Sequence, residues 1–420
     1  MKRLLLAAML GLMALAPAQA DTVVKYLNIA SIPDEVKLMN EAKAEYEAAH
    51  PGVKIELPFL ENEAFKAKLT TLLQSADAPD VFHSWGGGVF YEQAKAGVLR
   101  PIEGVLSQEA KDAQGTAGVA AFTAPDGHIY GIARDVSEVV LWYNKKLFAQ
   151  AGVDPASLAT WDGFLAAVQK FKDAGITPLA VGAKDKWPAH FWWSKLVVRL
   201  AGQDGFNAAA RGDGDGFAGP EFVKAGELFL QLAALNPWQE GFQAATYGDA
   251  SGYFGDGKAA MHLMGDWDYG AMKDNSATKK GIPDEDLGIL PFPTIDGGKG
   301  DPTDTLGGLS GYLFSKNASD ESVKFIEWYN SAPVQARFAN ANFYIPIVKG
   351  AADGMTNPFK VQVAKDINQA HWHALFFDQA LGPAVGGVVN DVSADLAANA
   401  VSAQDAAEQV KEAVDENLGK

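Results

Sequence analysis

The chain has 420 residues, no cysteine and a formal net charge of −17 at pH 7. This length is enough for two domains with separate hydrophobic cores. The acidic balance makes nucleic acid or an anionic membrane a poor general partner, and a chain without thiols forms no disulfides. Ten tryptophans are many for such a chain, so we expect some of them to contact a ligand instead of filling a core.

The first twenty residues are typical of an export signal. Residues 2–3 are basic, residues 4–16 form an apolar run too short to span a bilayer, and residues 18–20 read Ala-Gln-Ala, a cleavage site. We therefore expect a signal peptide over 1–20 and a mature, periplasmic chain beginning at Asp21. Attachment of lipid to an N-terminal cysteine is not expected, because the chain has no cysteine. No later apolar run approaches the length of a membrane span.

Strands and helices alternate at the start of the mature chain. Residues 23–29 predict a buried strand, a helix begins at Pro33, and residues 53–57 alternate as a second strand. A second helix follows, and residues 81–82 predict a third strand. This βαβαβ order predicts a parallel, right-handed, doubly wound sheet.

Tryptophans follow predicted strands at two places. Trp85 follows the third strand and precedes three glycines, which would let a ligand approach backbone N–H groups. Trp267 follows the apolar run 259–264 and Gly265, with Asp266 suited to cap the next helix. Ligands of open α/β sheets bind at the carboxyl ends of strands. From the residues alone, a ligand platform and a core side chain are about equally good readings of Trp267.

A second alternation of strands and helices begins with the apolar strand 139–145, in which Trp142 is expected to be core. Thr160 should cap a helix over 162–174, and a strand follows over 176–181. Trp187 then lies in a predicted exposed loop, whereas Trp192 and Trp193 are expected to pack within a helix. This pattern predicts a second α/β domain.

Three local patterns carry no chemistry of their own. Residues 211–219 contain a literal G-x-G-x-x-G, but no strand precedes it and its two aspartates would repel phosphate, so a solvated loop is expected. Tyr312 stands where a nucleophile elbow around Ser310 would need glycine. His371 and His373 lack a nearby acidic partner, so no metal site is predicted.

Four motifs, in order, resemble one known family. They are Ala78-Pro79-Asp80-Val81 before an aromatic loop, Trp142-Tyr143-Asn144-Lys145-Lys146-Leu147-Phe148, Thr160-Trp161-Asp162 through Ala174-Gly175-Ile176-Thr177-Pro178-Leu179, and Phe254-Gly255-Asp256-Gly257-Lys258-Ala259-Ala260-Met261 ending in Gly265-Asp266-Trp267. Together they resemble the family 1 extracellular solute-binding proteins of ABC importers, the maltose-binding-protein-like family. The order and spacing of the motifs extend over nearly the whole mature chain.

The resemblance implies a two-lobed α/β periplasmic binding protein fold with discontinuous lobes. It places the N-terminal lobe at 21–135 and 307–345 and the C-terminal lobe at 136–306 and 346–420. Strands crossing near Asp135, Leu306 and Tyr344 would form the hinge. The implied protein is a monomer that uses no cofactor, closes over a mono- or oligosaccharide and delivers it to membrane permease subunits.

The family's ligand contacts transfer to this chain residue by residue. Sugar faces lie flat on tryptophan, and carboxylates accept hydrogen bonds from hydroxyl groups. Asp135 is the implied carboxylate at the first crossing, with Ser137 and Glu138 as competitors. The remaining implied contacts are Ser31, Glu63, Ser84, Trp85, Gly86, Trp187, Asp266, Trp267, Gly308 and, in the segment 372–378, Trp372 and Asp378.

Two other classes of function stay open at this stage. An exported glycoside hydrolase or lyase would also carry tryptophans and carboxylates, but no spacing singles out a catalytic pair. The same fold could instead bind a polyamine, which needs an aromatic cage with acids, or an organic acid, which needs basic residues in the cleft. The loops that carry the motifs hold few basic residues, which disfavours an anion. We therefore expect a binding protein without enzymatic activity.

Overall fold

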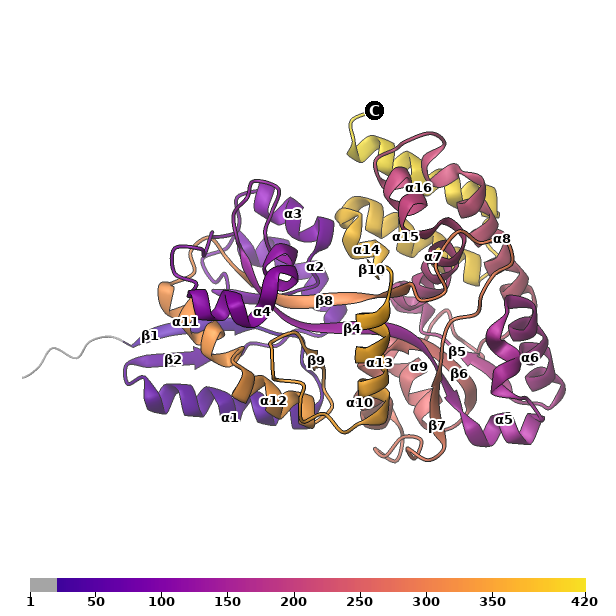
Figure 1. The fold of residues 1–420 in the computed structure, drawn as a ribbon, viewed down its shortest axis with the longest axis horizontal. Coiled ribbons are helices and arrows are strands. Elements are labelled where there is room, and N and C mark those ends of the chain that lie inside the picture. Colours follow the sequence, from indigo (N-terminus) through magenta and orange to yellow (C-terminus); the bar gives the residue numbers. More distant parts are fainter. Residues whose placement is uncertain (1–20) are drawn as a thin grey trace, which may run out of the picture.

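The computed structural model describes residues 21–420, so the predicted signal peptide and its cleavage site lie outside the described residues. The described chain forms two α/β lobes, and two long strands run through the middle of the molecule between them (Figure 1). These strands are β4 (Gly131–Asn144) and β8 (Thr305–Phe314). The predicted two-lobed α/β fold is confirmed.

The first lobe is built around the predicted parallel strands. In the sheet, β1 lies between β2 and β3 and is parallel to both, with Val24 opposite Ile55 and Tyr26 opposite Val81. The βαβαβ prediction is therefore confirmed. The elements of this lobe are β1 (Thr22–Leu27), α1 (Pro33–Ala49), β2 (Val53–Glu56), α2 (Asn62–Leu73), β3 (Val81–Ser84), α3 (Gly87–Lys95), α4 (Gln108–Ala121), α11 (Asp320–Tyr329) and α12 (Ala332–Asn340).

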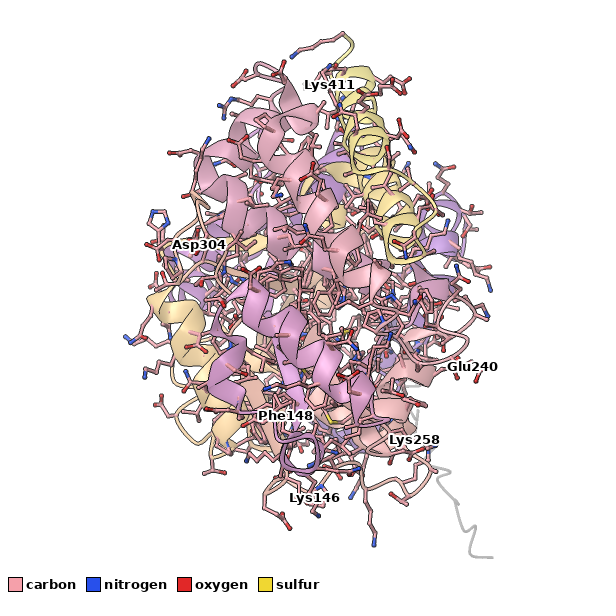
Figure 2. The ribbon with its side chains drawn as sticks, turned by 90° about the vertical axis from the view of Figure 1, so that its right-hand side faces the viewer. Lys146, Phe148, Glu240, Lys258, Asp304 and Lys411 are labelled. Atoms are coloured by element: carbon pink, nitrogen blue, oxygen red, sulfur yellow. The ribbon has the colours of Figure 1, made fainter. Side chains whose placement is uncertain are left out.

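The second lobe is larger and mostly helical. Figure 2 shows its end face, with Lys411 at one end and Lys146 and Lys258 at the other. Its elements are α5 (Lys145–Ala151), α6 (Trp161–Asp173), β5 (Thr177–Ala180), α7 (Trp187–Ala210), α8 (Pro220–Ala234), α9 (Tyr247–Gly255), β6 (Ala259–Gly265), α10 (Asp268–Asn275), β7 (Leu287–Leu290), α13 (Pro358–Gln369), β10 (His373–Leu375), α14 (Phe377–Ala380), α15 (Gly382–Ala397) and α16 (Ala403–Asn417), with short 3₁₀ turns at Pro155–Ala159, Ala183–Asp185 and Gly216–Ala218.

One strand takes part in both lobes. The first part of β4 pairs antiparallel with β8 as far as Glu138, and its second part pairs antiparallel with β6 from Val139 onward. A register shift between Ala133 and Asp135 interrupts the first ladder, and β9 (Ile345–Pro346) pairs with β4 at Asp135. The three segments expected to cross between the lobes thus lie side by side. The residue boundaries of the lobes stay a prediction.

Helix starts and core tryptophans follow the sequence signals. The Thr160 hydroxyl accepts a hydrogen bond from Gly163 N at 3.2 Å and caps α6, as predicted. Trp142, Trp192 and Trp193 are fully buried, which confirms that they fill the core. Within residues 21–420, no helix combines the length and the apolar character needed to cross a membrane.

Two expectations about loops are wrong. Gly87 and Gly88 begin α3 and pack against the backbone of residues 379–382, so a Cβ on Gly87 would lie 2.8 Å from the Gln379 carbonyl oxygen. These glycines serve a close contact between helices and leave no room for a ligand. The segment 211–219 is not wholly solvated, because Phe217 is fully buried against Phe206 and Phe222.

Candidate functional site

A cleft with a volume of ≈ 800 Å³ lies where the two lobes meet, in front of the crossing strands. Its first wall comes from the loops after β1 and β3 and from α2, and its second wall comes from the starts of α7, α9 and α10. Of the residues predicted to bind ligand, eight line this cleft: Ser31, Glu63, Trp85, Asp135, Trp187, Asp266, Trp267 and Asp378.

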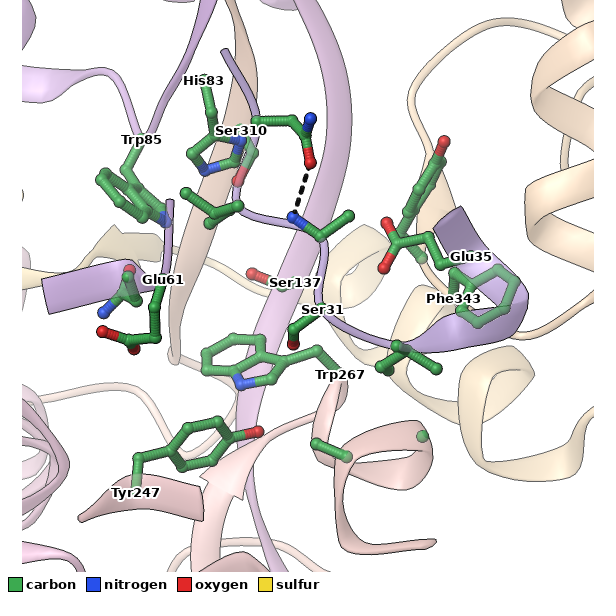
Figure 3. A pocket seen from close by; sticks show the side chains of 18 of the residues that line it. Ser31, Glu35, Glu61, His83, Trp85, Ser137, Tyr247, Trp267, Ser310 and Phe343 are labelled. Atoms are coloured by element: carbon green, nitrogen blue, oxygen red, sulfur yellow. Dashed lines mark hydrogen bonds between the residues drawn. The ribbon is translucent and has the colours of Figure 1, made fainter. Parts of the chain in front are cut away.

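Trp267 lies in the middle of the cleft. Figure 3 shows its indole between Tyr247 on one side and Ser31 and Ser137 on the other. The ring folds back over Gly265, where a Cβ would lie 1.9 Å from the indole, so this position requires glycine. The ring is half-buried, and its edge-to-face neighbour Phe376 lies 5.8 Å away between ring centroids. Part of the indole is therefore exposed to the cleft.

Trp85 and Trp187 lie on opposite walls and share one cation. The ammonium group of Lys66, on α2, is 5.4 Å from the centroid of Trp85 and 5.7 Å from that of Trp187. Trp187 is buried at the first position of α7, so the expectation that it lies in an exposed loop is wrong. Because α2 and α7 belong to different lobes, Lys66 links the two walls by cation–π contacts.

Asp266 is part of a buried ion pair and does not cap the next helix. Trp267 precedes the first residue of α10, and the Asp266 carboxylate instead accepts hydrogen bonds from Lys360 Nζ at 2.6 Å and from Glu138 N at 3.0 Å. The side chains of Asp266 and Lys360 are 2% and 1% exposed. The predicted capping role is therefore wrong. This pair fixes α13 to the end of β6 directly behind the cleft.

Asp135 is paired with its sequence neighbour. Arg134 Nε donates to Asp135 Oδ1 at 2.7 Å, and the guanidinium lies 4.8 Å from the ring centroid of Tyr344. Burial raises the pKa of the Asp135 carboxyl, and Arg134 opposes that rise. Because a buried, paired carboxylate keeps a free lone pair, it can still accept a hydrogen bond from a ligand.

Four predicted contacts lie away from the surface of the cleft. Ser84 is buried and its hydroxyl accepts from Gly86 N at 3.1 Å, which shapes the turn before α3. Gly308 lies in β8, where a Cβ would be 2.4 Å from the Phe376 ring. Trp372 packs on Phe206, with 5.6 Å between ring centroids. These placements do not support Ser84, Gly86, Gly308 and Trp372 as direct contacts in this arrangement of the lobes.

Several cleft residues were not predicted from the sequence. Tyr247 begins α9, and its hydroxyl donates to the buried Asp268 carboxylate at 2.9 Å, which fixes the ring 5.0 Å from Trp187. The capping box at Thr246 and Asp249 was a usable signal for the start of this helix. Glu35 and Phe343 also line the cleft and are drawn on the same side of it in Figure 3. No sequence signal connects these two residues.

The charges around the cleft are unequal. Three basic side chains line it, Lys66, Arg134 and Lys184, against seven carboxyl groups, Glu35, Glu61, Glu63, Asp135, Asp185, Asp266 and Asp378. Burial raises the pKa of Glu35 to about 7 and also raises the pKa values of Glu63 and Asp185. Lys66 and Arg134 are already paired with Glu63 and Asp135. The arrangement suits an uncharged ligand better than an anion.

Among the described residues, no group of three or more His, Asp or Glu side chains is placed to hold a metal ion. His371 is mostly exposed and its Nδ1 lies 3.1 Å from Asp304 Oδ1, so it has the acidic partner that the sequence did not reveal.

Comparison with known proteins gives one family. Residues 30–336 match the family model described as bacterial extracellular solute-binding protein. An ABC transporter extracellular-binding protein of Pyrococcus horikoshii is 28% identical over 253 residues, which cover 59% of this chain and 55% of that protein. The chain thus matches somewhat more than half the length of this curated relative.

Solved structures share the fold over almost their whole length. A structure from a study of xylan utilization by Caldanaerobius polysaccharolyticus superposes with a TM-score of 0.86 and 25% identity, covering 93% of this chain and 99% of that one. A chitin oligosaccharide binding protein gives a TM-score of 0.83 and 24% identity, covering 96% and 99%. MalE from Bdellovibrio bacteriovorus bound to maltotriose gives 0.73 and 19%, covering 95% and 100%.

Proposed function

The chain belongs to the bacterial extracellular solute-binding protein family, and on that premise we propose that it binds an uncharged oligosaccharide and delivers it to the permease of an ABC importer. Members of this family are binding proteins, which agrees with the expectation that the chain is not an enzyme. The similar structure from the xylan study favours a plant-type oligosaccharide as the first ligand to test.

The observation that carries the proposal is the composition of the cleft. Tryptophan faces alternate there with carboxylates and hydroxyl groups, which is the chemistry that sugar C–H faces and hydroxyls require. Its volume of ≈ 800 Å³ lies in the upper part of the range of about 300–1,000 Å³ for small-molecule sites. An oligosaccharide fills this space better than a single sugar ring.

Charged ligands fit the side chains of the cleft less well than an uncharged sugar does. A cationic ligand would compete with Lys66, whose ammonium already occupies the position next to Trp85 and Trp187. An anionic ligand would meet an excess of carboxyl groups, and two of the three cations are already paired. Both classes nevertheless belong in the binding panel as controls.

Binding is proposed to close the lobes around β4 and β8. The proposed boundaries at 135, 306 and 345 lie in β4, β8 and β9. Small-angle scattering of the ligand-bound protein should give a smaller radius of gyration than that of the free protein. An unchanged profile at saturating ligand would contradict closure.

A thermal-shift panel followed by calorimetry tests the proposed ligand class. The panel contains xylo-, chito- and malto-oligosaccharides, spermidine and galacturonate. A ligand present at a hundredfold excess over its Kd adds about 2.7 kcal/mol to the stability of the native state, so a cognate sugar should raise Tm clearly. The proposal would be refuted if spermidine or galacturonate raised Tm and none of the neutral oligosaccharides did. Unchanged sugar after prolonged incubation would exclude hydrolase activity.

Export is part of the same proposal. The family is extracellular, and the basic start, apolar run and Ala18-Gln19-Ala20 motif favour cleavage after Ala20. N-terminal sequencing of the secreted protein should begin at Asp21, and a chain that still begins at Met1 would contradict this.

A further inference from the structure

His83 is a buried polar side chain on the cleft that makes no hydrogen bond. It lies in β3, is 2% exposed and lines the cleft close to Trp85 and Ser310 (Figure 3). Neither Nδ1 nor Nε2 has a hydrogen-bond partner among residues 21–420. Buried polar groups are almost always paired, and leaving one unpaired costs free energy, so two unpaired nitrogens on one ring require an explanation.

A second cleft histidine, unlike His83, is hydrogen-bonded by the protein at one of its two ring nitrogens. His190, in α7, is 1% exposed, and its Nδ1 lies 2.7 Å from the Trp187 carbonyl oxygen. Its Nε2 faces Asp378 Oδ1 at 3.9 Å. His190 is thus oriented by a hydrogen bond at one nitrogen, whereas the part of the chain that the structure describes forms no hydrogen bond with the His83 ring.

We propose that His83 is a ligand-binding residue that exchanges hydrogen bonds with a hydroxyl group of an uncharged sugar. This inference rests on the proposed function and names a contact that the resemblance did not supply. A neutral imidazole has one donor and one acceptor, and a sugar hydroxyl can serve both roles. Either tautomer of His83 therefore suits the same ligand group.

The surroundings of His83 favour a hydroxyl over a charged group. Burial, with Arg134 and Lys66 nearby, holds the pKa of the imidazole well below its usual value, so the ring is neutral and offers no charge to an anion. Because Arg134 and Lys66 are themselves paired with carboxylates, an incoming carboxylate would find no free cation there. A hydroxyl group loses less hydration than a carboxylate when it enters this site, and it can pair with the imidazole nitrogens.

Trp85 places the sugar within reach of His83. The two ring centroids are 4.6 Å apart and the rings are nearly perpendicular, at 79°. A sugar held at the half-buried Trp85 side chain would therefore lie next to the imidazole. Trp85 then supplies contact area, and His83 discriminates between ligands with and without a hydroxyl at that position.

The test is calorimetric titration of His83→Phe and His83→Gln with the sugar that binds the wild type most tightly in the panel. His83→Phe keeps a ring of similar size but removes both nitrogens, and we expect affinity to fall by about tenfold. His83→Gln keeps a donor and an acceptor and should recover part of the loss. The melting temperature of unliganded His83→Phe should be equal to or above that of the wild type, because two unpaired buried groups are removed.

His373→Gln is the matched control. Its Nε2 is also buried without a partner, and burial lowers its pKa to about 4, but its Nδ1 contacts Thr305 Oγ1 at 2.8 Å and it does not line the cleft. This variant should bind the sugar as the wild type does. The ¹⁵N imidazole resonances of His83, and not those of His373, should shift on addition of sugar.

The outcomes separate this inference from the proposed function. If the wild type binds a sugar but His83→Phe binds it equally well, or the His83 resonances do not move, His83 is a structural residue and the inference is overturned while the proposed function stands. If no sugar in the panel binds the wild type, both fail together. If His83→Phe loses much of its Tm, the ¹⁵N imidazole resonances of His83 in the wild type decide the test, and resonances that do not move on addition of sugar overturn the inference.

Discussion

Truncation of Trp267 to alanine separates a ligand platform from a core side chain. A central aromatic anchor in a binding site costs about 2–4 kcal/mol when truncated, or roughly 30- to 1,000-fold in affinity. The structural cost should be smaller, because the ring is half-buried and its packing partners are Phe191 at 6.3 Å and Phe376 at 5.8 Å. At about 0.5–1.5 kcal/mol for each aromatic pair, these two contacts contribute about 1–3 kcal/mol beyond the burial of the ring's area.

Trp192→Ala is the matched control for this experiment. Trp192 is 1% exposed and packs among Phe164, Phe229 and Phe292 in the second lobe. Its truncation should cost about 3–5 kcal/mol of stability, which corresponds to a fall in Tm of about 6–20 °C for a domain of this size. The affinity of the folded protein for sugar should change little.

The assay is a pair of measurements on each variant, a thermal melt without ligand and a calorimetric titration with the best sugar of the panel. Trp267→Ala should show the larger loss of affinity, and Trp192→Ala the larger loss of Tm. If Trp267→Ala keeps wild-type affinity, or melts as low as Trp192→Ala, then Trp267 is not the platform. Trp267→Phe should fall between the wild type and the alanine variant in affinity.

Three further predictions test the hinge and the walls of the cleft. Lys360→Met leaves the buried Asp266 carboxylate without its ammonium partner and should lower the free energy of unfolding by about 3–5 kcal/mol. Thermal melts should show that adding Asp266→Asn recovers part of this stability. If the losses of the two single variants simply add in the double variant, the pairing is contradicted. Gly270→Leu should hold the lobes apart, because a Cβ on Gly270 already lies 3.0 Å from Ile32 Cδ1 across the cleft; scattering should show no compaction with sugar, and normal closure would refute this. Burial raises the pKa of Glu35 to about 7, so between the ordinary carboxyl pKa and pH 7 the folded state binds more protons than the unfolded state. The free energy of unfolding should therefore fall as the pH rises through that window. Glu35→Gln should flatten the plot of Tm against pH, and parallel plots for the variant and the wild type would contradict the raised pKa.

The sequence predicted the parts of the molecule that depend on local signals. The alternation of strands and helices, the Thr160 cap and the buried Trp142 follow from periodicity and capping chemistry. The position of Trp267 followed from a buried strand that ends in glycine. These features require only neighbouring residues, and the structure agrees with them.

Other features depend on residues far apart in the chain. Asp266 looked like a helix cap because its partner Lys360 is 94 positions away. The glycines after Trp85 looked like an open approach for ligand because their actual neighbours, residues 379–382, come from the other end of the chain. His83 packs against Phe65, and Glu35 interacts with Arg134, which is 99 positions away in the chain. No local pattern carries that information.

The pairing of β3 with β8 has a consequence for how the chain is made. Val81 lies opposite Phe314, so the central sheet of the first lobe lacks one neighbour of β3 until most of the chain has been translated. At about 5–20 residues per second, Phe314 leaves the ribosome roughly 10–50 s after Val81. During that interval the sheet of the first lobe is incomplete, because β8 pairs with β3 on the side opposite β1. A ribosome-bound nascent chain that ends before Thr305 should therefore remain sensitive to protease throughout its first lobe.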